Sequence, residues 1–291
     1  MSEAEVATRY QSVLAGPLRI FYREAGRADA PAVLLLHGYP SSSRMFEPLL
    51  PLLREDFRLI APDYPGFGLS ETPDPQLHPY SFDTLAAAME AFILTLGLKR
   101  YSLYLQDYGA PVGLRLALAH PERVRALIIQ NAVLHEEGLS EAWKLRRAYW
   151  ADRAQHEPAL RAGLSSVEAG IARHVGGRAA PERFNPDLWM DEIAFLTRPG
   201  AADIQLALMH DYQSNLRAYP AWQAYLRERR PPLLVLWGMH DPIFSVDGAH
   251  ALRREQPDAE LHLLEAGHFA INDCPERIAQ HVRWFLQHTP C

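Results

Sequence analysis

The chain has 291 residues, 48% of them hydrophobic, so it can bury a sizeable core in one large domain or in a domain with an insertion. Its formal net charge of −6 excludes the basic surface that nucleic-acid-binding proteins use. Two cysteines, Cys274 and Cys291, are too few for a disulfide framework. The polar, acidic N-terminus does not resemble a signal peptide, and no apolar run reaches the roughly 18 residues of a membrane span. We therefore expect a cytoplasmic protein, monomeric or homodimeric, without nucleic-acid or membrane partners.

Strand-like and helical patterns alternate in the first half of the chain. The run of apolar residues at 32–36 is typical of a central strand that is buried on both faces. Apolar or alternating runs predict strands, and a period of 3.6 residues predicts helices; the strands are 18–23, 32–36, 57–61, 101–105 and 124–129, and the helices are 45–53, 82–98 and 112 to about 121. Strands that alternate with helices predict right-handed crossovers and a mostly parallel sheet.

This alternation stops between residues 134 and 229. The segment has no strand-like run and is rich in Arg, Ala, Leu and aromatic residues. Beyond it, the pattern predicts strands at 231–238 and 260–264 and helices at 249–254 and 275–287. We therefore predict a core domain made of 1–133 and 230–291, with 134–229 inserted as a helical cap, or lid. The aromatic content of this cap favours a small apolar ligand.

Polar residues stand directly after several predicted strands. Asp107 follows the strand 101–105 at a tight turn into the next helix, and Asp241 and His268 each follow a later strand. An Asp before a helix is commonly an N-cap. A carboxylate at such a turn is also raised above the sheet, beside free helix N–H groups that favour negative charge. Because ligand sites of parallel sheets lie outside the carboxyl ends of the strands, we expect these three side chains to converge.

Several other site classes are excluded by their motifs. The Gly-x-Gly at 66–68 lacks a third glycine, because Glu71 occupies that position, so a dinucleotide-binding loop is rejected. No Gly-x-Ser-x-Gly motif of a serine hydrolase is present. No His-Glu-x-x-His occurs, and His135, His210 and His240 lack the spacing of metal ligands. We therefore predict neither a metal site nor a cofactor.

Five motifs occur in the order that is characteristic of α/β-hydrolases. They are His37-Gly-Tyr-Pro40, Asp63-Tyr-Pro-Gly-Phe-Gly68, Gln106-Asp-Tyr-Gly109, Gly238-Met-His-Asp-Pro242 and Gly267-His-Phe269. Over nearly its whole length the chain resembles an α/β-hydrolase with a helical cap, an α/β fold whose mostly parallel sheet is flanked by helices. Asp107 occupies the nucleophile position, as in epoxide hydrolases and haloalkane dehalogenases. One departure is Leu105, where a glycine is common.

This resemblance implies a catalytic triad and a mechanism without a cofactor. Asp107 would attack a saturated carbon and form an alkyl-enzyme ester. Water activated by His268 would then cleave the ester, while Asp241 holds the histidine in the required tautomer. The backbone N–H groups of Tyr39 and Tyr108 would stabilise the oxyanion that forms.

The leaving group distinguishes the two activities of this family. Dehalogenases bind the departing halide with a Trp directly after the nucleophile and with a second Trp or an Asn. Here those positions hold Tyr108 and Tyr39, although Gln106 matches the dehalogenases. Epoxide hydrolases place two proton-donating tyrosines in the cap, and Tyr149 and Tyr212 are the candidates for this role. The alternative for both is that they are packing residues of the cap.

We therefore predict the hydrolysis of a small apolar epoxide to a diol. Tyr39, Tyr108 and Trp150 are expected to contact the substrate. A haloalkane dehalogenase is the main alternative, and a small-molecule binding protein that retains the triad is the third. The resemblance also implies a cis peptide bond before Pro40 and a structural role for His37.

Overall fold

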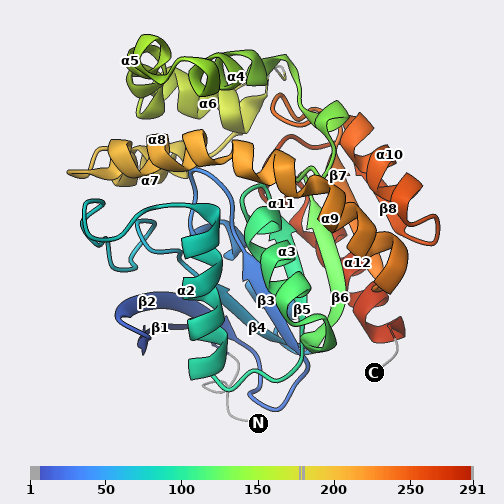
Figure 1. The fold of residues 1–291 in the computed structure, drawn as a ribbon. Helices are drawn as coiled ribbons and strands as arrows, with labels where there is room; N and C mark the ends of the chain where they lie inside the picture. The colour runs from blue at the N-terminus through green and yellow to red at the C-terminus, as the bar shows by residue number, and fades with distance from the viewer. Residues whose placement is uncertain (1–6, 177, 179–180, 290–291) are drawn as a thin grey trace.

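A computed structural model describes residues 7–176, 178 and 181–289, which are built around one eight-stranded sheet (Figure 1). The strand order is β1-β2-β4-β3-β5-β6-β7-β8; β2 is antiparallel to both its neighbours, and the other pairs are parallel. The strands are β1 (Arg9–Ala15), β2 (Leu18–Ala25), β3 (Ala32–Leu36), β4 (Arg58–Pro62), β5 (Tyr101–Gln106), β6 (Val124–Gln130), β7 (Leu233–Gly238) and β8 (Glu260–Leu264). The predicted α/β class with a mostly parallel sheet is confirmed.

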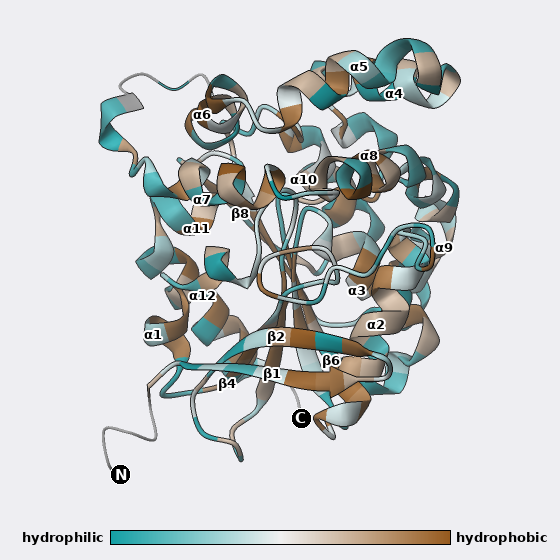
Figure 2. Ribbon diagram, turned by 90° about the vertical axis from the view of Figure 1, so that its left-hand side faces the viewer, coloured by the Kyte–Doolittle hydropathy of each residue, from teal (hydrophilic) through white to brown (hydrophobic). Residues whose placement is uncertain are grey.

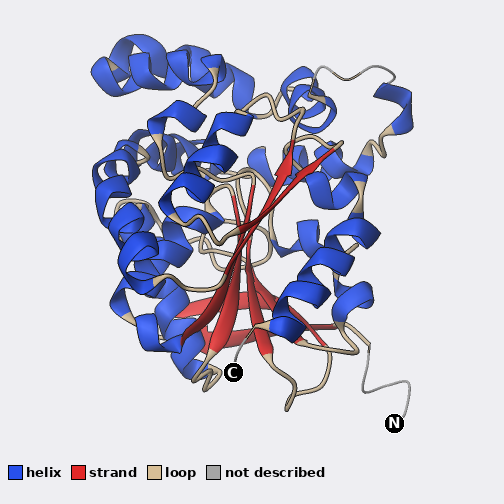
Figure 3. Ribbon diagram, turned by 90° about the vertical axis from the view of Figure 1, so that its right-hand side faces the viewer, coloured by secondary structure: helices blue, strands red, loops and turns tan. Residues whose placement is uncertain are grey.

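Helices cover both faces of this sheet (Figure 3). The apolar side chains of β3 pack on both faces of the sheet. Leu34 and Leu36 belong to the hydrophobic cluster on one face, and Val33 and Leu35 belong to the cluster on the other. The first cluster includes residues of α2 (Phe82–Thr95), α3 (Gly109–Ala119) and α10 (Val246–Glu255) and continues into the helices between β6 and β7. The second includes residues of α1 (Leu50–Leu53), α11 (Ala270–Asp273) and α12 (Pro275–His288). Hydrophobic residues accordingly follow the strands, and hydrophilic residues dominate the outer faces of the helices (Figure 2).

Two elements differ from the sequence prediction. The helix expected at 45–53 is divided into a 3₁₀ turn at Ser43–Phe46 and the single turn α1. Pro48 and Pro51 lie within this segment, and a proline lacks the N–H group that a continuous helix requires. The strand β1 was not predicted, because most of its residues are polar or exposed; it forms the edge of the sheet by pairing with β2.

Helices make up the chain between β6 and β7. They are α4 (Lys144–Ala151), α5 (Arg153–Leu164), α6 (Val167–Val175), α7 (Asp187–Leu196), α8 (Ala201–Asp211) and α9 (Gln213–Arg229), with short 3₁₀ turns at Glu136–Gly138, Glu141–Trp143 and Pro181–Arg183. Helices α4 to α8 lie over one end of the sheet, whereas α9 descends beside α3 (Figure 1). We keep the name cap for residues 134–229; its bounds remain a prediction. None of the described helices has the length and apolar character of a membrane span.

Hydrogen bonds join this cap to the core. Asp211 of α8 accepts a hydrogen bond from the backbone N–H of Phe82, at the start of α2, at 2.8 Å. Arg115 of α3 donates to the side-chain oxygen of Asn215 at 2.8 Å. Asn215 is fully buried, so this contact fixes the start of α9 against the core.

Candidate active site

Asp107 occupies a strained turn between β5 and α3. Its φ of 50° is in the left-handed region, which residues other than glycine rarely adopt. Its Oδ1 accepts hydrogen bonds from the backbone N–H groups of Tyr39, at 3.0 Å, and of Tyr108, at 2.6 Å. The N-cap residue of α3 is Tyr108, whose side chain makes no capping hydrogen bond. Asp107 is therefore not the N-cap of this helix. The peptide bond between Tyr39 and Pro40 is cis, as the family resemblance implies.

Two glycines make room for this turn. A Cβ atom added to Gly38 would lie 2.4 Å from the Cβ of Asp107, so the close approach of the two loops requires glycine there. A Cβ added to Gly113, on α3, would lie 2.2 Å from Cδ2 of Leu105. Gly113 therefore accommodates the large side chain of Leu105, which replaces the glycine that is common at this position.

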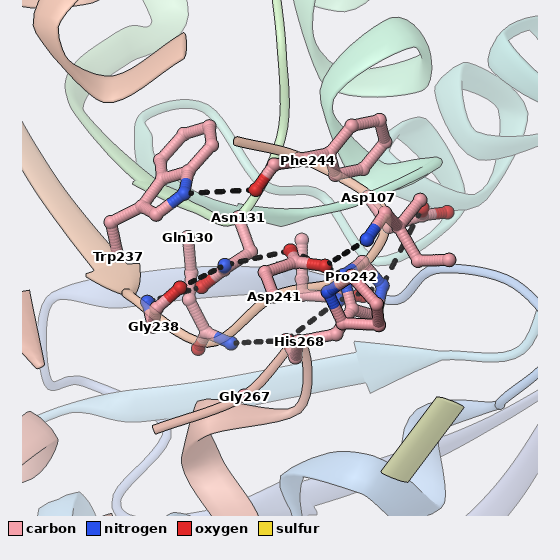
Figure 4. Close-up of polar contacts among 12 residues, drawn as sticks. Asp107, Gln130, Asn131, Trp237, Gly238, Asp241, Pro242, Phe244, Gly267 and His268 are labelled. Carbon is pink, nitrogen blue, oxygen red and sulfur yellow. Dashed lines mark hydrogen bonds and ion pairs between the residues drawn. The ribbon is translucent and has the colours of Figure 1, made fainter. Parts of the chain in front are cut away.

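His268 lies between two carboxylates (Figure 4). Its Nδ1 is 2.8 Å from Oδ2 of Asp241, and its Nε2 is 3.6 Å from Oδ2 of Asp107. The side-chain nitrogen of Gln106 lies 3.0 Å from Nε2, which fits a tautomer with the proton on Nδ1, donated to Asp241. The structure thus brings the three predicted triad residues together. In this tautomer, Nε2 can accept a proton from a water molecule beside Asp107.

Asp241 is itself held by Asn131, a residue that the sequence analysis did not select (Figure 4). The side-chain nitrogen of Asn131 donates to Oδ2 of Asp241 at 2.8 Å, and its oxygen accepts the backbone N–H of Gly238 at 2.9 Å. The backbone N–H of Ile243 donates to the other oxygen of Asp241 at 2.7 Å. Asn131 stands directly after β6, so its place at a strand end was the available signal.

Burial and neighbouring charges shift the pKa values of this pair. Burial raises the pKa of Asp107 above its ordinary value, and the charge of His268 and the two backbone N–H groups oppose this increase only in part. Burial lowers the pKa of His268, but the charge and hydrogen bond of Asp241 and the charge of Asp107 raise it above its ordinary value. His268 therefore binds a proton more readily than a free histidine, as a general base should.

His37 has the structural role that the resemblance implies. Its ring is fully buried, and its Nε2 accepts the backbone N–H of Tyr64 at 3.2 Å. Its Nδ1 lies 3.0 Å from the carbonyl oxygen of Gly38. Burial lowers the pKa of His37 to about 4, so the ring is neutral at physiological pH and connects two loops of the site.

The other histidines considered as ligands have local partners. His135 contacts Glu255 at 2.8 Å, and His240 contacts Glu265 at 2.8 Å. His210 lies in α8. Within residues 7–176, 178 and 181–289, no group of three or more His, Cys, Asp or Glu side chains is placed to hold a metal ion.

A small cavity of about 20 Å³ opens onto Asp107, with room for roughly one water molecule. It is lined by Tyr39, Asp107, Tyr108, Trp143, Arg146, Arg173, Ile243 and His268. Tyr39 and Tyr108, both predicted to contact the substrate, therefore line the cavity beside Asp107. Trp143, Arg146 and Arg173 come from the cap, and no motif in the sequence indicated them. The two arginines make this cavity less apolar than the cap's composition suggested.

The structure places two of the predicted cap residues away from this cavity. The hydroxyl of Tyr149 donates to the carbonyl oxygen of Leu206, within the cap, at 3.2 Å. The indole N–H of Trp150 donates to the carbonyl oxygen of Met209 at 2.7 Å. Neither residue lines the cavity, because both side chains are used to pack the cap helices together. The structure therefore does not bring Tyr149 or Trp150 to the cavity beside Asp107, and their roles toward a substrate stay predictions.

Tyr212 lies one layer behind the cavity. Its ring centroid is 4.5 Å from that of Trp143 and 6.0 Å from that of Tyr108, both of which line the cavity. Burial raises the pKa of Tyr212 well above its ordinary value, and burial also raises the pKa values of Tyr39 and Tyr108. All three phenols are therefore protonated at neutral pH, but only Tyr39 and Tyr108 line the cavity.

Comparison with known proteins agrees with this architecture. The family model described as alpha/beta hydrolase fold matches residues 31–273. An uncharacterized hydrolase of Saccharomyces cerevisiae, YNR064C, is 39% identical over 269 residues, covering 91% of this chain and 92% of that protein. Haloalkane dehalogenase 2 of Mycobacterium tuberculosis is 30% identical over 284 residues, covering 90% of this chain and 89% of that protein.

Solved structures show the same fold. Cfl2 from Burkholderia cenocepacia superimposes with a TM-score of 0.79 at 25% identity, covering 98% of this chain and 97% of that one. The haloalkane dehalogenase DbeA from Bradyrhizobium elkanii has a TM-score of 0.74 at 24% identity, covering 97% and 98%. With its sheet topology, its strand-end triad and these relatives, the chain belongs to the α/β-hydrolase fold family.

Proposed function

We propose that this hydrolase acts through a covalent ester between Asp107 and its substrate, and that the substrate is a small epoxide. The observation that carries the proposal is the position of the Asp107 carboxylate. One of its oxygens accepts hydrogen bonds from two backbone N–H groups, and the other lies 3.6 Å from Nε2 of His268. Such a carboxylate can serve first as a nucleophile and then as the carbonyl group of an ester.

In the first step, Oδ2 of Asp107 attacks a ring carbon of the epoxide. The ring C–O bond breaks, and the ring oxygen takes a proton from a phenol. Tyr39 and Tyr108, which line the cavity, are the proposed proton donors, and their raised pKa values keep both phenols protonated at neutral pH. The ester then carries the whole substrate, because no part of it has left.

In the second step, water attacks the carbonyl carbon of the ester. Nε2 of His268 accepts a proton from the water, and Asp241 stabilises the resulting imidazolium. Negative charge develops on Oδ1 of Asp107, where the N–H groups of Tyr39 and Tyr108 already donate. The ester C–O bond breaks as the His268 imidazolium gives its proton to the leaving oxygen, so the diol leaves with the former Oδ2 atom. The second proton of the water passes from the new carboxyl group to the phenolate, and Asp107 is restored as a carboxylate with one oxygen from water.

Haloalkane hydrolysis is the second candidate, because relatives of this chain carry the name haloalkane dehalogenase. A departing halide requires N–H donors. The indole N–H of Trp143, which lines the cavity, donates to the carbonyl oxygen of Ile243 at 3.1 Å. The indole N–H of Trp237 donates to the carbonyl oxygen of Phe244 at 3.3 Å. With these two N–H groups occupied, we favour the epoxide.

The variant His268→Gln tests both the mechanism and the leaving group. Without the base, we expect Asp107 to be alkylated and the ester to persist, as intact-protein mass spectrometry would show. An epoxide adds its whole mass, whereas a haloalkane adds its alkyl group less one hydrogen. His240→Gln, at an exposed histidine paired with Glu265, is the matched control and should not accumulate the adduct. If neither substrate class alkylates His268→Gln on Asp107, the proposed function is wrong; an adduct with haloalkanes alone would select the second candidate.

A further inference from the structure

We infer that Arg146 and Arg173 form a subsite for a carboxylate group of the substrate. The inference rests on the proposed function, because it concerns the cavity in which Asp107 would act. It specifies the substrate class as a short acid whose reactive carbon lies next to the carboxylate, such as a 2,3-epoxycarboxylate. This class replaces the purely apolar substrate that the composition of the cap suggested.

Arg173 brings unused hydrogen-bond donors to the cavity. It extends from α6, its side chain is only 12% exposed, and its guanidinium carbon lies 5.7 Å from the ring centroid of Tyr39. The carboxylate of Glu192 lies 3.7 Å from Nε, which is within ion-pair distance but too far for a hydrogen bond. Nε and Nη2 are both buried without an acceptor. Since a buried donor without an acceptor is costly, a bound anion is the partner that this geometry lacks.

Arg146 reaches the same cavity from α4. Its guanidinium carbon lies 4.9 Å from the ring of Trp143, and Nη1 donates to the carbonyl oxygen of Ala142 at 3.3 Å. Among the described residues, no carboxylate lies within ion-pair distance of Arg146, unlike its neighbour Arg147, which pairs with Glu136 at 2.9 Å. Arg146 therefore presents a charge to the cavity that is not neutralised by an ion pair.

The chemistry of the guanidinium group favours binding of a substrate carboxylate over protonation of the epoxide oxygen. An arginine keeps its protons at neutral pH, so it cannot act as the acid that protonates an epoxide oxygen. Its planar fork instead matches the two oxygens of a carboxylate. The charge of Arg146, which has no ion-pair partner among the described residues, also offsets the repulsion between an anionic substrate and Asp107, whereas Glu192 balances part of the charge of Arg173.

Substrate pairs that differ only in charge test this inference. We would compare kcat/KM for 2,3-epoxypropanoate and for the nearly isosteric 2,3-epoxypropanamide. Hydrogen bonds to charged groups predict a preference for the acid of roughly 30-fold or more in the wild type. Arg173→Met and Arg146→Met should each remove about tenfold or more of that preference, mainly through KM for the acid. Arg147→Met removes the same charge from α4 outside the cavity, so it should keep the preference.

The outcomes separate this inference from the proposed function. If the wild type hydrolyses the amide as well as the acid, or if Arg147→Met loses the preference as strongly as Arg146→Met, the carboxylate subsite is wrong while the ester mechanism stands. If His268→Gln forms no adduct with any epoxide or haloalkane, the proposed function itself fails. If Arg173→Met does not fold, Arg173→Lys takes its place. This variant keeps the positive charge but lacks the planar guanidinium group that donates two parallel hydrogen bonds. Its expected result is a partial loss of preference, and an unchanged preference would contradict the role of Arg173.

Discussion

The two oxygens of Asp107 have different surroundings, which divides their roles. Oδ1 accepts both backbone N–H groups, so it is the atom on which the oxyanion would develop. Oδ2 faces His268, so it is the atom that would attack carbon. In the proposed mechanism, a single strained residue provides the nucleophile and, once alkylated, the electrophile for water.

At the same scale, the phenol that protonates the opening ring can be identified by substitution. Tyr108→Phe removes a hydroxyl from a residue that lines the cavity, so we expect the rate of alkylation by an epoxide to fall by about tenfold or more. Tyr149→Phe is the control, because its hydroxyl bonds to Leu206 within the cap. Stopped-flow measurement of single turnovers would separate alkylation from hydrolysis. An equal effect of the two substitutions would contradict this assignment.

The ionisation of His268 predicts a pH dependence for the second step. His268 accepts a proton only when it is neutral, so ester hydrolysis should slow as the pH falls through its pKa. The charge of Asp107 contributes to the raised pKa of His268 in the free enzyme, and alkylation removes that charge. We therefore expect the midpoint for decay of the ester to lie below the pKa of His268 measured by NMR in the free enzyme. A midpoint above that pKa, or a rate that rises towards low pH, would contradict the role of His268.

Individual residues differ in how far the sequence could identify them. Asp107, Asp241 and His268 each stand in a short motif after a strand, so order along the chain was sufficient to select them. Arg146 and Arg173 stand in helices of a segment with many arginines, and nothing local distinguishes those that face the cavity. Their role depends on how the cap helices pack, which is a property of tertiary structure.

Among the elements, the turn between β5 and α3 depends on a fit between strand and helix. Leu105 points at Gly113, and its size leaves no space for a Cβ there. A leucine at this position is therefore tolerated because the facing helix carries a glycine. This pairing could not be inferred from the strand alone, since it requires the distance between two elements.

A double-mutant cycle tests this fit. We expect Gly113→Ala to destabilise the wild type by about 1–3 kcal/mol, because the new methyl group overlaps Leu105. In the background of Leu105→Ala the overlap is gone, and Gly113→Ala should stabilise the helix by roughly 0.5–1 kcal/mol. Urea denaturation would give the four free energies of unfolding. Additive effects would show that the two residues do not share this space.

The extent of each element was predicted less well than its existence. The buried strands were recognised because a continuous apolar run is characteristic of a parallel sheet. The edge strand β1 was missed, since its alternating and partly exposed residues carry a weak hydrophobic signal. The segment 45–53 was interpreted as one helix because its apolar spacing outweighed two prolines that interrupt it.

For the whole molecule, chemistry and selectivity come from different parts of the chain. The proposed nucleophile, base and triad acid stand at strand ends of the core, whereas Trp143, Arg146 and Arg173 reach the cavity from the cap. Strand ends converge by topology, so the catalytic groups could be inferred from strand order. The cap follows no comparable rule, so the two arginines became visible only in the folded structure.

The covalent role of Asp107 is the central claim, and isotope transfer tests it most directly. A single turnover in water labelled with oxygen-18, with enzyme in excess over substrate, separates the two possible origins of the new hydroxyl oxygen. If the ester forms, the product receives an unlabelled oxygen from Asp107, and the peptide that contains Asp107 gains one labelled oxygen. Mass spectrometry of the product and of the digested enzyme should show this pattern. Labelled product together with unlabelled Asp107 would mean that water attacks the substrate directly, and would contradict the ester mechanism.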